Sequence, residues 1–275
     1  MDDPGPLERT APRRHPQSEG FEWRPARPEP ARRLSPAAID GFNRDGFCVV
    51  RGAFTPAEIA AVAAEIDPME AAHAEFARAR GGRVRLTDAE AITFTLHLVK
   101  RSPVLRAFAA HPAIKDIVHD LIGPDVRLYW DQAVYKKTEK PQDFPWHQDN
   151  GYSFVEPQQY LTLWIPLVDV DEANGCPWIA PGLHRLGTLE HRPTDIGLVC
   201  LDAAPDAVAA PARIGDVVVF SSLAPHRTGP NLGDAVRKAY ILQYAPDGAV
   251  VVLPDGQRLP QTDPDRQFFV LQGGR

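Results

Sequence analysis

The residues best suited to chemistry in this sequence are a histidine and an aspartate two positions apart, in Trp146-His147-Gln148-Asp149-Asn150. On an extended chain, side chains two residues apart project to the same side, so His147 and Asp149 can bind one metal ion. The spacing alone is weak evidence, because nine histidines and 36 acidic residues among 275 positions give about one such pair by chance. Support must come from elsewhere in the chain.

A second histidine follows a strand-like run later in the sequence. Gly215-Asp216 and four apolar residues precede Pro225-His226, and Arg237 comes eleven residues after His226. Two imidazoles and one carboxylate on one face of an octahedron leave three positions open, which is typical of non-haem Fe(II) oxygenases. These positions suit a chelating 2-oxo acid such as 2-oxoglutarate together with dioxygen. Arg237 can then hold the far carboxylate of this cosubstrate by paired, charge-assisted hydrogen bonds.

The same segments, in the same order, resemble the phytanoyl-CoA dioxygenase-like branch of the Fe(II)/2-oxoglutarate-dependent oxygenases. The resemblance extends from about Leu34 to Tyr244. Its motifs are Gly41-Phe42-Asn43-Arg44-Asp45-Gly46-Phe47-Cys48-Val49-Val50, His147-Gln148-Asp149, Trp164-Ile165-Pro166-Leu167, Glu172-Ala173-Asn174-Gly175-Cys176-Pro177-Trp178, Pro181-Gly182-Leu183-His184, and the His226 segment with Arg237. Leu183 stands where these relatives usually carry serine, so a contact that depends on that hydroxyl is missing here.

The resemblance implies a double-stranded β-helix, the jelly roll of cupin-like proteins, in which His147, Asp149 and His226 bind Fe(II). It also implies a set of residues for 2-oxoglutarate, namely Arg237, Thr228, Trp164, Gln132 and Lys136. The implied activity uses dioxygen, releases succinate and CO2, and hydroxylates or otherwise oxidises an unactivated C–H bond of a small molecule. Halogenating relatives lack the carboxylate ligand, so Asp149 favours hydroxylation. We expect a metabolite that is not a CoA thioester, such as a secondary metabolite.

Further residues are candidates for contact with the substrate. They are Trp146, Asn150 and Tyr152, which flank the metal motif, and His184. The run of Arg78, Arg80, Arg83 and Arg85 encloses Gly81-Gly82. It is either a solvated loop or a mobile lid that meets an anionic group of the substrate.

Capping patterns and periodicity predict the elements that position these residues. Helices are expected to begin at Ser35-Pro36, Thr55-Pro56, Ser102-Pro103 and His111-Pro112, the first ending at Gly46 and the second running through Ile66. Strands are expected at 47–50, 127–137, 160–168, 176–180, 215–221 and 237–245. Helices followed by strands indicate an α+β fold with a mainly β core, a jelly roll flanked by N-terminal helices.

Composition limits the organisation of the chain. Apolar residues make up 44% and charged residues 24% of the sequence, which is enough for a buried core. Residues 1–33 are crowded with proline and arginine and show no apolar period, which predicts a disordered tail. We therefore expect a single oxygenase domain over residues 34–275, a length that suits one β-rich domain.

Charge and hydropathy disfavour other classes of protein. The net charge of −6 is opposite to that of a protein that neutralises phosphates, so no nucleic-acid partner is expected. No apolar run approaches the ~20 residues that a bilayer requires, and we expect a cytoplasmic protein with no membrane association and no obligate protein partner. Two alternatives remain open. A cupin-type metalloenzyme that needs no 2-oxoglutarate is disfavoured by Arg237, and a catalytically silent jelly-roll binding protein is disfavoured by the complete triad.

Overall fold

Every α-helix in the described part of the chain begins at a proline. The computed structural model describes residues 12–275, and its α-helices are α1 (Pro36–Asp45), α2 (Pro56–Arg78), α3 (Pro103–Phe108) and α4 (Pro112–Leu121). A side chain just before each proline accepts a hydrogen bond from a first-turn N–H. Proline suits this position because its missing N–H would have no partner within the helix. The predicted helix starts are confirmed, but α2 continues past Ile66 to Arg78.

Most strands belong to one large antiparallel sheet. Its order is β1-β13-β8-β15-β5-β4-β3-β2, and β18 also pairs with β5. The strands are β1 (Phe47–Val50), β2 (Arg83–Val84), β3 (Thr87–Asp88), β4 (Ile92–Leu96), β5 (Val126–Lys136), β8 (Leu161–Pro166), β13 (Val217–Ser221), β15 (Arg237–Pro246) and β18 (Phe269–Leu271). The predicted long strands are therefore present, each within a few residues of its expected limits.

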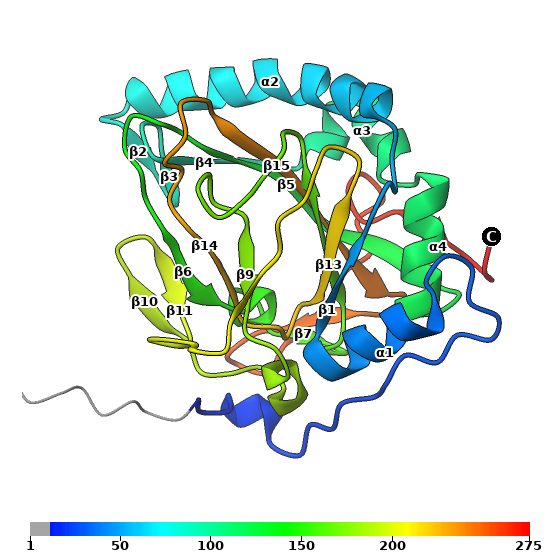
Figure 1. Ribbon diagram of the computed structural model, residues 1–275. Coiled ribbons are helices and arrows are strands. Elements are labelled where there is room, and N and C mark those ends of the chain that lie inside the picture. The colour runs from blue at the N-terminus through cyan, green and yellow to red at the C-terminus, as the bar shows by residue number, and fades with distance from the viewer. Residues whose placement is uncertain (1–11) are drawn as a thin grey trace, which may run out of the picture.

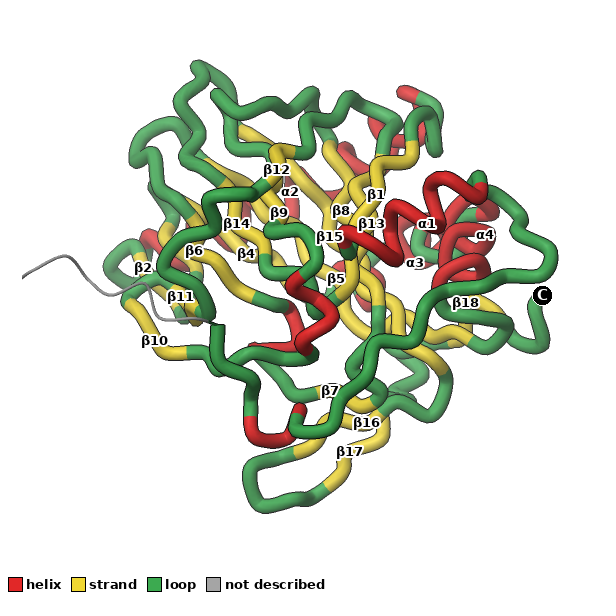
Figure 2. The backbone as a smooth tube through the Cα atoms, turned by 60° about the horizontal axis from the view of Figure 1, so that its bottom comes forward, coloured by secondary structure: helices red, strands yellow, loops and turns green. Residues whose placement is uncertain are grey.

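A smaller antiparallel sheet packs against the large one and completes the jelly roll. Its order is β12-β9-β14-β6, with β6 (Phe144–His147), β9 (Pro177–Ile179), β12 (Val208–Ala209) and β14 (His226–Thr228). The remaining strands are β7 (Val155–Glu156), β10 (Arg192–Thr194), β11 (Gly197–Val199), β16 (Val250–Val252) and β17 (Arg258–Pro260), and the 3-10 helices are η1 (Pro16–Ser18), η2 (Leu98–Lys100), η3 (Asp149–Gly151) and η4 (Leu183–Leu186). Figure 2 shows α1, α3 and α4 grouped beside β1 and β13, away from β6 and β14.

Alternation along the central strands divides the interior into two layers. In β13, Val217 and Val219 belong to the cluster that packs under the helices, whereas Val218 and Phe220 belong to the cluster between the two sheets. Successive side chains of a strand point to opposite faces, so this division follows from the period of two. The same alternation in β15 sends Tyr240, Leu242 and Tyr244 toward the helices. Arg237, Ala239 and Ile241 alternate with these residues and face the space between the sheets.

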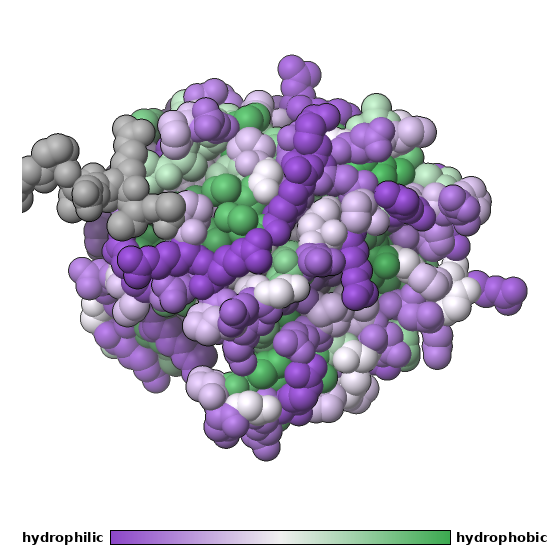
Figure 3. Space-filling view, turned by 90° about the horizontal axis from the view of Figure 1, so that it is seen from below, coloured by the Kyte–Doolittle hydropathy of each residue, from purple (hydrophilic) through white to green (hydrophobic). Residues whose placement is uncertain are grey.

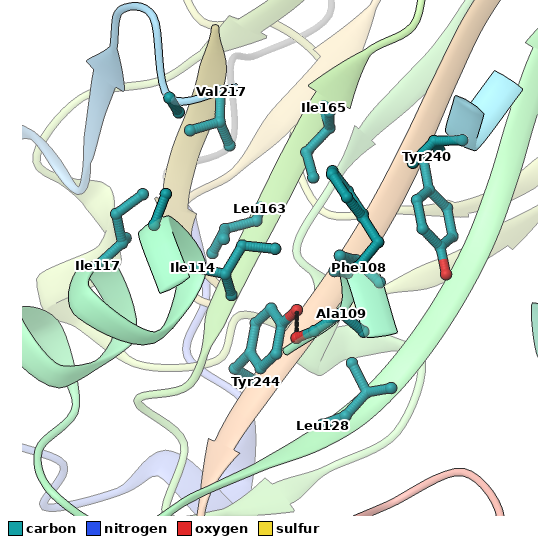
Figure 4. Packing of buried hydrophobic residues seen from close by; sticks show 14 of the residues in the cluster. Phe108, Ala109, Ile114, Ile117, Leu128, Leu163, Ile165, Val217, Tyr240 and Tyr244 are labelled. Atoms are coloured by element: carbon teal, nitrogen blue, oxygen red, sulfur yellow. Dashed lines mark hydrogen bonds between the residues drawn. The ribbon is translucent and has the colours of Figure 1, made fainter. Parts of the chain in front are cut away.

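The layer under the helices is a packed apolar core that contains a hydrogen bond from a buried tyrosine hydroxyl. Phe108 and Ile114 from the helices meet Leu163 of β8 and Tyr240 of β15 there (Figure 4). The hydroxyl of Tyr244 donates a 2.8 Å hydrogen bond to the carbonyl of Ala109, drawn as a dashed line in Figure 4. A buried tyrosine hydroxyl needs such a partner. The contact joins α3 to the sheet, and the helices thus cover one face of the fold, as predicted.

Residues 12–33 correct the expectation of a disordered tail. This segment, which we call the strap, runs along the lower edge of the molecule in Figure 1, over the largely hydrophilic face shown in Figure 3. Ser18 is fully buried and its hydroxyl donates a 2.9 Å hydrogen bond to Gln158. The ring of Trp23 meets that of His184 edge-on at 4.5 Å. The first eleven residues, which the disorder prediction also covers, lie outside the described part of the chain.

The end of the strap is held by one buried carboxylate. Asp120 of α4 is 2% exposed and accepts hydrogen bonds of 2.8–2.9 Å from the backbone N–H groups of Arg32, Arg33 and Leu34. Removing an acceptor leaves buried donors without a partner, at a cost of about 1–3 kcal/mol each. This contact therefore fixes where the strap joins α1.

We expect Asp120→Ala to release the strap and to lower the free energy of unfolding by at least about 2 kcal/mol. Urea denaturation measures the loss, and limited trypsin digestion should cut the variant first among the arginines of the strap. Asp116→Asn, on the same helix but with no side-chain hydrogen bond to the described residues, is the matched control. Equal proteolysis of the Asp120 variant and the wild type would show that other contacts hold the strap.

Candidate functional site

Three potential metal ligands meet between the two sheets. His147 ends β6 and His226 begins β14, and the two residues are direct partners in the antiparallel pairing of these strands. Asp149 opens η3, immediately after β6. Its Oδ1 lies 3.9 Å from Nε2 of each histidine, and one ligand atom from each of the three residues lies within 4.8 Å of the others. The arrangement could hold one metal ion, and it unites the residues that the sequence predicts.

Both histidines are oriented with Nε2 toward this centre. Nδ1 of His147 lies 2.8 Å from the carbonyl of Pro145, and Nδ1 of His226 lies 3.0 Å from the carbonyl of Ala224. Because a carbonyl only accepts, each Nδ1 donates its proton and leaves the lone pair of Nε2 free. Burial lowers the pKa of His147 to about 3 and that of His226 to about 4. Both rings are therefore neutral near pH 7, the form that binds a metal.

Asp149 is oriented by two residues that the sequence analysis missed. The hydroxyl of Thr162 donates to Asp149 Oδ2, and the amide of Gln243 lies 3.4 Å from that same hydroxyl. Oδ1 consequently remains available to a metal ion. Burial raises the pKa of Asp149 above its usual value, an effect that a bound cation would oppose. A sequence signal existed, because Thr162 lies two positions from Trp164 on a strand and therefore shares its face.

We expect Thr162→Val to weaken metal binding about 10–100-fold without unfolding the protein, because it removes the group that orients Asp149. The measurement is a titration of the metal-free protein with Fe(II) under anaerobic conditions. Thr95→Val is the matched control, because the Thr95 hydroxyl is buried without a hydrogen-bond partner among residues 12–275. If both variants bind metal like the wild type, Thr162 does not position the carboxylate.

Arg237 lies buried in the same space with most of its hydrogen-bonding capacity unused. It is 1% exposed, and its NH1 group donates a 3.1 Å hydrogen bond to the carbonyl of Val134. Its Nε and NH2 groups have no partner in the described part of the chain, and its guanidinium carbon lies 5.3 Å from the centre of the Trp164 ring. Burial lowers its pKa to about 9. A buried cation with free donors is suited to an anionic ligand.

A small cavity of about 50 Å³ joins Arg237 to the three potential metal ligands. Thr228, Trp164 and Gln132 line it as well, so four of the five residues expected to bind the cosubstrate come together there. Lys136 does not line this cavity, and its placement corrects that expectation. Its ammonium donates to the carbonyls of Gln142, Thr228 and Gly229, at 2.8, 3.0 and 2.5 Å. Lys136 therefore holds the C-terminal end of β14 in place through backbone carbonyls.

A second cavity, of about 730 Å³, adjoins the potential metal ligands and includes His147 and Asp149 in its wall. Of the four residues expected to contact substrate, Tyr152 lines this cavity, and its ring meets that of His147 edge-on at 5.5 Å. Residues missed by the sequence analysis supply most of the remaining wall, among them Phe94, Phe144 and Trp130. These residues lie on strands whose apolar pattern predicts core rather than cavity.

The other three substrate candidates lie elsewhere. Trp146 is buried in an apolar cluster with Ala180 and Val199, because the residue before His147 faces the opposite side of β6. Asn150 is 1% exposed and bonds to Thr188 and to the backbone of Val155. His184 packs against Trp23 of the strap. All three thus have structural contacts in place of the expected substrate contacts.

Sequence comparison relates the chain to a family of dioxygenases. The profile of the phytanoyl-CoA dioxygenase (PhyH) family matches residues 42–239. An ectoine dioxygenase of Bordetella parapertussis is 28% identical over 156 residues, 55% of this chain and 50% of that protein, so the chain spans about half the length of this relative. Phytanoyl-CoA dioxygenase domain-containing protein 1 of Rattus norvegicus is 24% identical over 280 residues, 84% of this chain and 96% of that protein.

Comparison with solved structures confirms the fold. The crystal structure of the epimerase SnoN in complex with Fe3+, alpha ketoglutarate and nogalamycin RO covers 86% of this chain and 100% of its own, with a TM-score of 0.66 and 22% identity. At this level of identity the likeness shows the fold alone, and it agrees with the expected jelly roll. Within residues 12–275, no helix is both long and apolar enough to cross a bilayer.

Proposed function

The chain belongs to the phytanoyl-CoA dioxygenase family, and from that premise we propose that it is a non-haem Fe(II)- and 2-oxoglutarate-dependent dioxygenase. In the proposed reaction a small-molecule metabolite is hydroxylated, or otherwise oxidised, at an unactivated C–H bond. Dioxygen is consumed, and succinate and CO2 are released. The proposed catalytic domain extends from residue 34 to residue 275.

One observation carries this proposal beyond the family: the free, buried guanidinium of Arg237 in the cavity that also contains the three potential metal ligands. A buried charge without a partner is costly, so it is retained where a ligand supplies the opposite charge. A dicarboxylate that chelates the metal at one end can meet Arg237 at the other. A metalloenzyme that needs no 2-oxoglutarate gives no reason for this cation.

Each residue of the site then has a role. His147, Asp149 and His226 hold Fe(II), while Arg237 binds the far carboxylate of 2-oxoglutarate. Thr228, Trp164 and Gln132 complete the wall around the cosubstrate, and Phe220 and Ile241 exclude water from it. When bound, the iron supplies the activation of dioxygen and couples the decarboxylation of 2-oxoglutarate to oxidation of the substrate. The protein supplies position, neutral histidines and a dry cavity.

The first test is anaerobic. Fe(II) and then 2-oxoglutarate are added to the purified protein and to His147→Ala, and the visible absorption of a chelated 2-oxo acid is recorded. We expect a band in the wild type and none in the variant. Release of succinate in air then identifies substrates from a panel of metabolites.

Other outcomes favour the alternatives. Iron binding without a band, in a folded protein, would indicate a cupin-type metalloenzyme that does not use 2-oxoglutarate. No iron binding at all would indicate a silent jelly-roll binding protein. Either result would contradict the proposed activity while leaving the fold unchanged.

A further inference from the structure

The 730 Å³ cavity beside the metal site has an aromatic interior. Phe94, Tyr129, Trp130, Phe144, Tyr152 and Tyr160 line it. Aromatic walls bury large apolar areas and suit the flat or extended apolar parts of a ligand. His147 and Asp149 are part of the wall. An apolar group that fills this interior is therefore brought next to the potential metal ligands.

Apart from Asp149 of the triad, the charged side chains that line the cavity are positive. Arg85 and Arg101 line it, and among the described lining residues the single carboxylate is that of Asp149 in the triad. Neither arginine forms an ion pair within residues 12–275. The pKa of His73, which also lines the cavity, is lowered by burial and by Arg101. The positive charge of the cavity therefore resides on the two guanidinium groups.

Arg85 differs from the other arginines of its run. It lies in the turn between β2 and β3, with a φ of 52°, beside the C-terminal end of α2 (Figure 1). Arg83 of the same hairpin lies 3.7 Å from Asp88, and Arg80 lies over the ring of Phe76. The guanidinium of Arg85 has neither kind of partner in the described chain, and its side chain lines the cavity. Arg78 also has no such partner in the described chain but does not line the cavity, so Arg85 is the member of the run that is available to a ligand there.

Arg101 marks the mouth of the cavity. Its NH2 group donates a 2.7 Å hydrogen bond to the carbonyl of Leu96, which fixes the side chain. Arg101 and His73 line both this cavity and a neighbouring groove on α2 that includes Met69 and Phe76. Both arginines are exposed residues, whereas the interior is aromatic. The cavity is consequently apolar at depth and cationic where it opens.

We infer that the substrate is an amphipathic oxyanion, with an apolar body in the aromatic interior and its anionic group held by Arg85 and Arg101 at the mouth. This inference rests on the proposed function and specifies its substrate class. It also predicts where the substrate is oxidised, because the apolar end lies toward the metal site. Oxidation should take place on the apolar body, remote from the anionic group.

The test uses two fluorescent probes that share rings but differ in charge. 8-Anilinonaphthalene-1-sulfonate carries a sulfonate, and N-phenyl-1-naphthylamine is its neutral counterpart. Leu96 lines the cavity, and Leu96→Trp places a larger side chain in it. The probe binding that this variant loses is therefore counted as binding to the cavity. We expect Arg85→Gln and Arg101→Gln each to weaken sulfonate binding about tenfold and to leave neutral binding unchanged. Arg78→Gln, in the same run but outside the cavity wall, is the matched control.

The probe-binding measurements either support or overturn the inference, and they do not depend on catalytic activity. Loss of sulfonate affinity in both variants, with restoration by Arg101→Lys, supports the inference. Equal sulfonate affinity in the wild type and the double variant, or no binding that Leu96→Trp removes, overturns it. The measurement needs neither iron nor 2-oxoglutarate, so its failure is distinguishable from failure of the proposed activity, which the absorption band and succinate release report.

Discussion

Arg237→Met is expected to remove 2-oxoglutarate binding while leaving the ligand-free protein more stable than the wild type. In the absence of ligand, the buried guanidinium has one hydrogen bond, to Val134, and two nitrogens without partners in the described chain. Replacing buried charged groups by apolar side chains of similar volume is often stabilising, by about 1–4 kcal/mol. Loss of a bidentate contact to a carboxylate should weaken cosubstrate binding at least about 100-fold.

Thermal unfolding with and without ligand separates these two effects. A ligand present at about 100 times its dissociation constant stabilises the folded state by about 2.7 kcal/mol. Under anaerobic conditions with Fe(II), 2-oxoglutarate should therefore raise the melting temperature of the wild type and not that of Arg237→Met. Arg227→Met is the matched control, because Arg227 lies on β14 near the rings of Trp146 and Trp178, outside the cavity. A normal 2-oxoglutarate shift in Arg237→Met would refute the assigned role.

The sequence predicted the residues of the centre because strand geometry is regular. His147 and Asp149 are two apart, and the position of His147 opposite His226 follows from the pairing of β6 with β14. The same rule explains a wrong prediction. Trp146 is adjacent to His147 and so must face the other way. Alternation applied strictly would have rejected Trp146 and selected Thr162, which shares a face with Trp164.

Lys136 and His184 show what strand geometry does not determine. Lys136 is the direct partner of Arg237 in the pairing of β5 with β15, and two adjacent cations repel each other. Its long side chain instead reaches three carbonyls that other segments supply. His184 lies in a 3-10 helix, and its contacts come from the strap. These positions depend on tertiary contacts that spacing along one segment cannot reveal.

The prediction that the strap is disordered was wrong for a related reason. Its composition predicts disorder because it offers few apolar side chains. The end of the strap is held by hydrogen bonds that backbone N–H groups donate to the carboxylate of Asp120. Every residue except proline carries such a donor, whatever its side chain. The information therefore lies in a buried carboxylate on α4, far along the chain, and not in the composition of the segment itself.

The second large effect is expected from Asp149→Asn, which changes the charge of the metal site and keeps its shape. An asparagine oxygen can still accept the hydrogen bond from Thr162, so the metal-free protein should fold normally. Burial disfavours the carboxylate, as the raised pKa of Asp149 indicates. Metal-free Asp149→Asn should therefore be at least as stable as the wild type in urea. The hydrogen bond from Thr162 offsets part of this cost, and a bound cation would compensate the buried negative charge itself.

Loss of that charge should cost the protein its metal and its activity. We expect iron affinity to fall at least about 100-fold and turnover to fall by about 1,000-fold or more, because a charged ligand is lost and not merely reoriented. Iron content after anaerobic reconstitution and succinate release measure the two effects. Asp143→Asn, which removes the carboxylate 3.5 Å from Arg227, is the control for a general change of charge. Full iron content and turnover in Asp149→Asn would exclude Asp149 as a ligand. If Asp149→Asn instead has a higher free energy of unfolding than the wild type and does not retain iron, the carboxylate of Asp149 serves metal binding and lowers the stability of the metal-free fold.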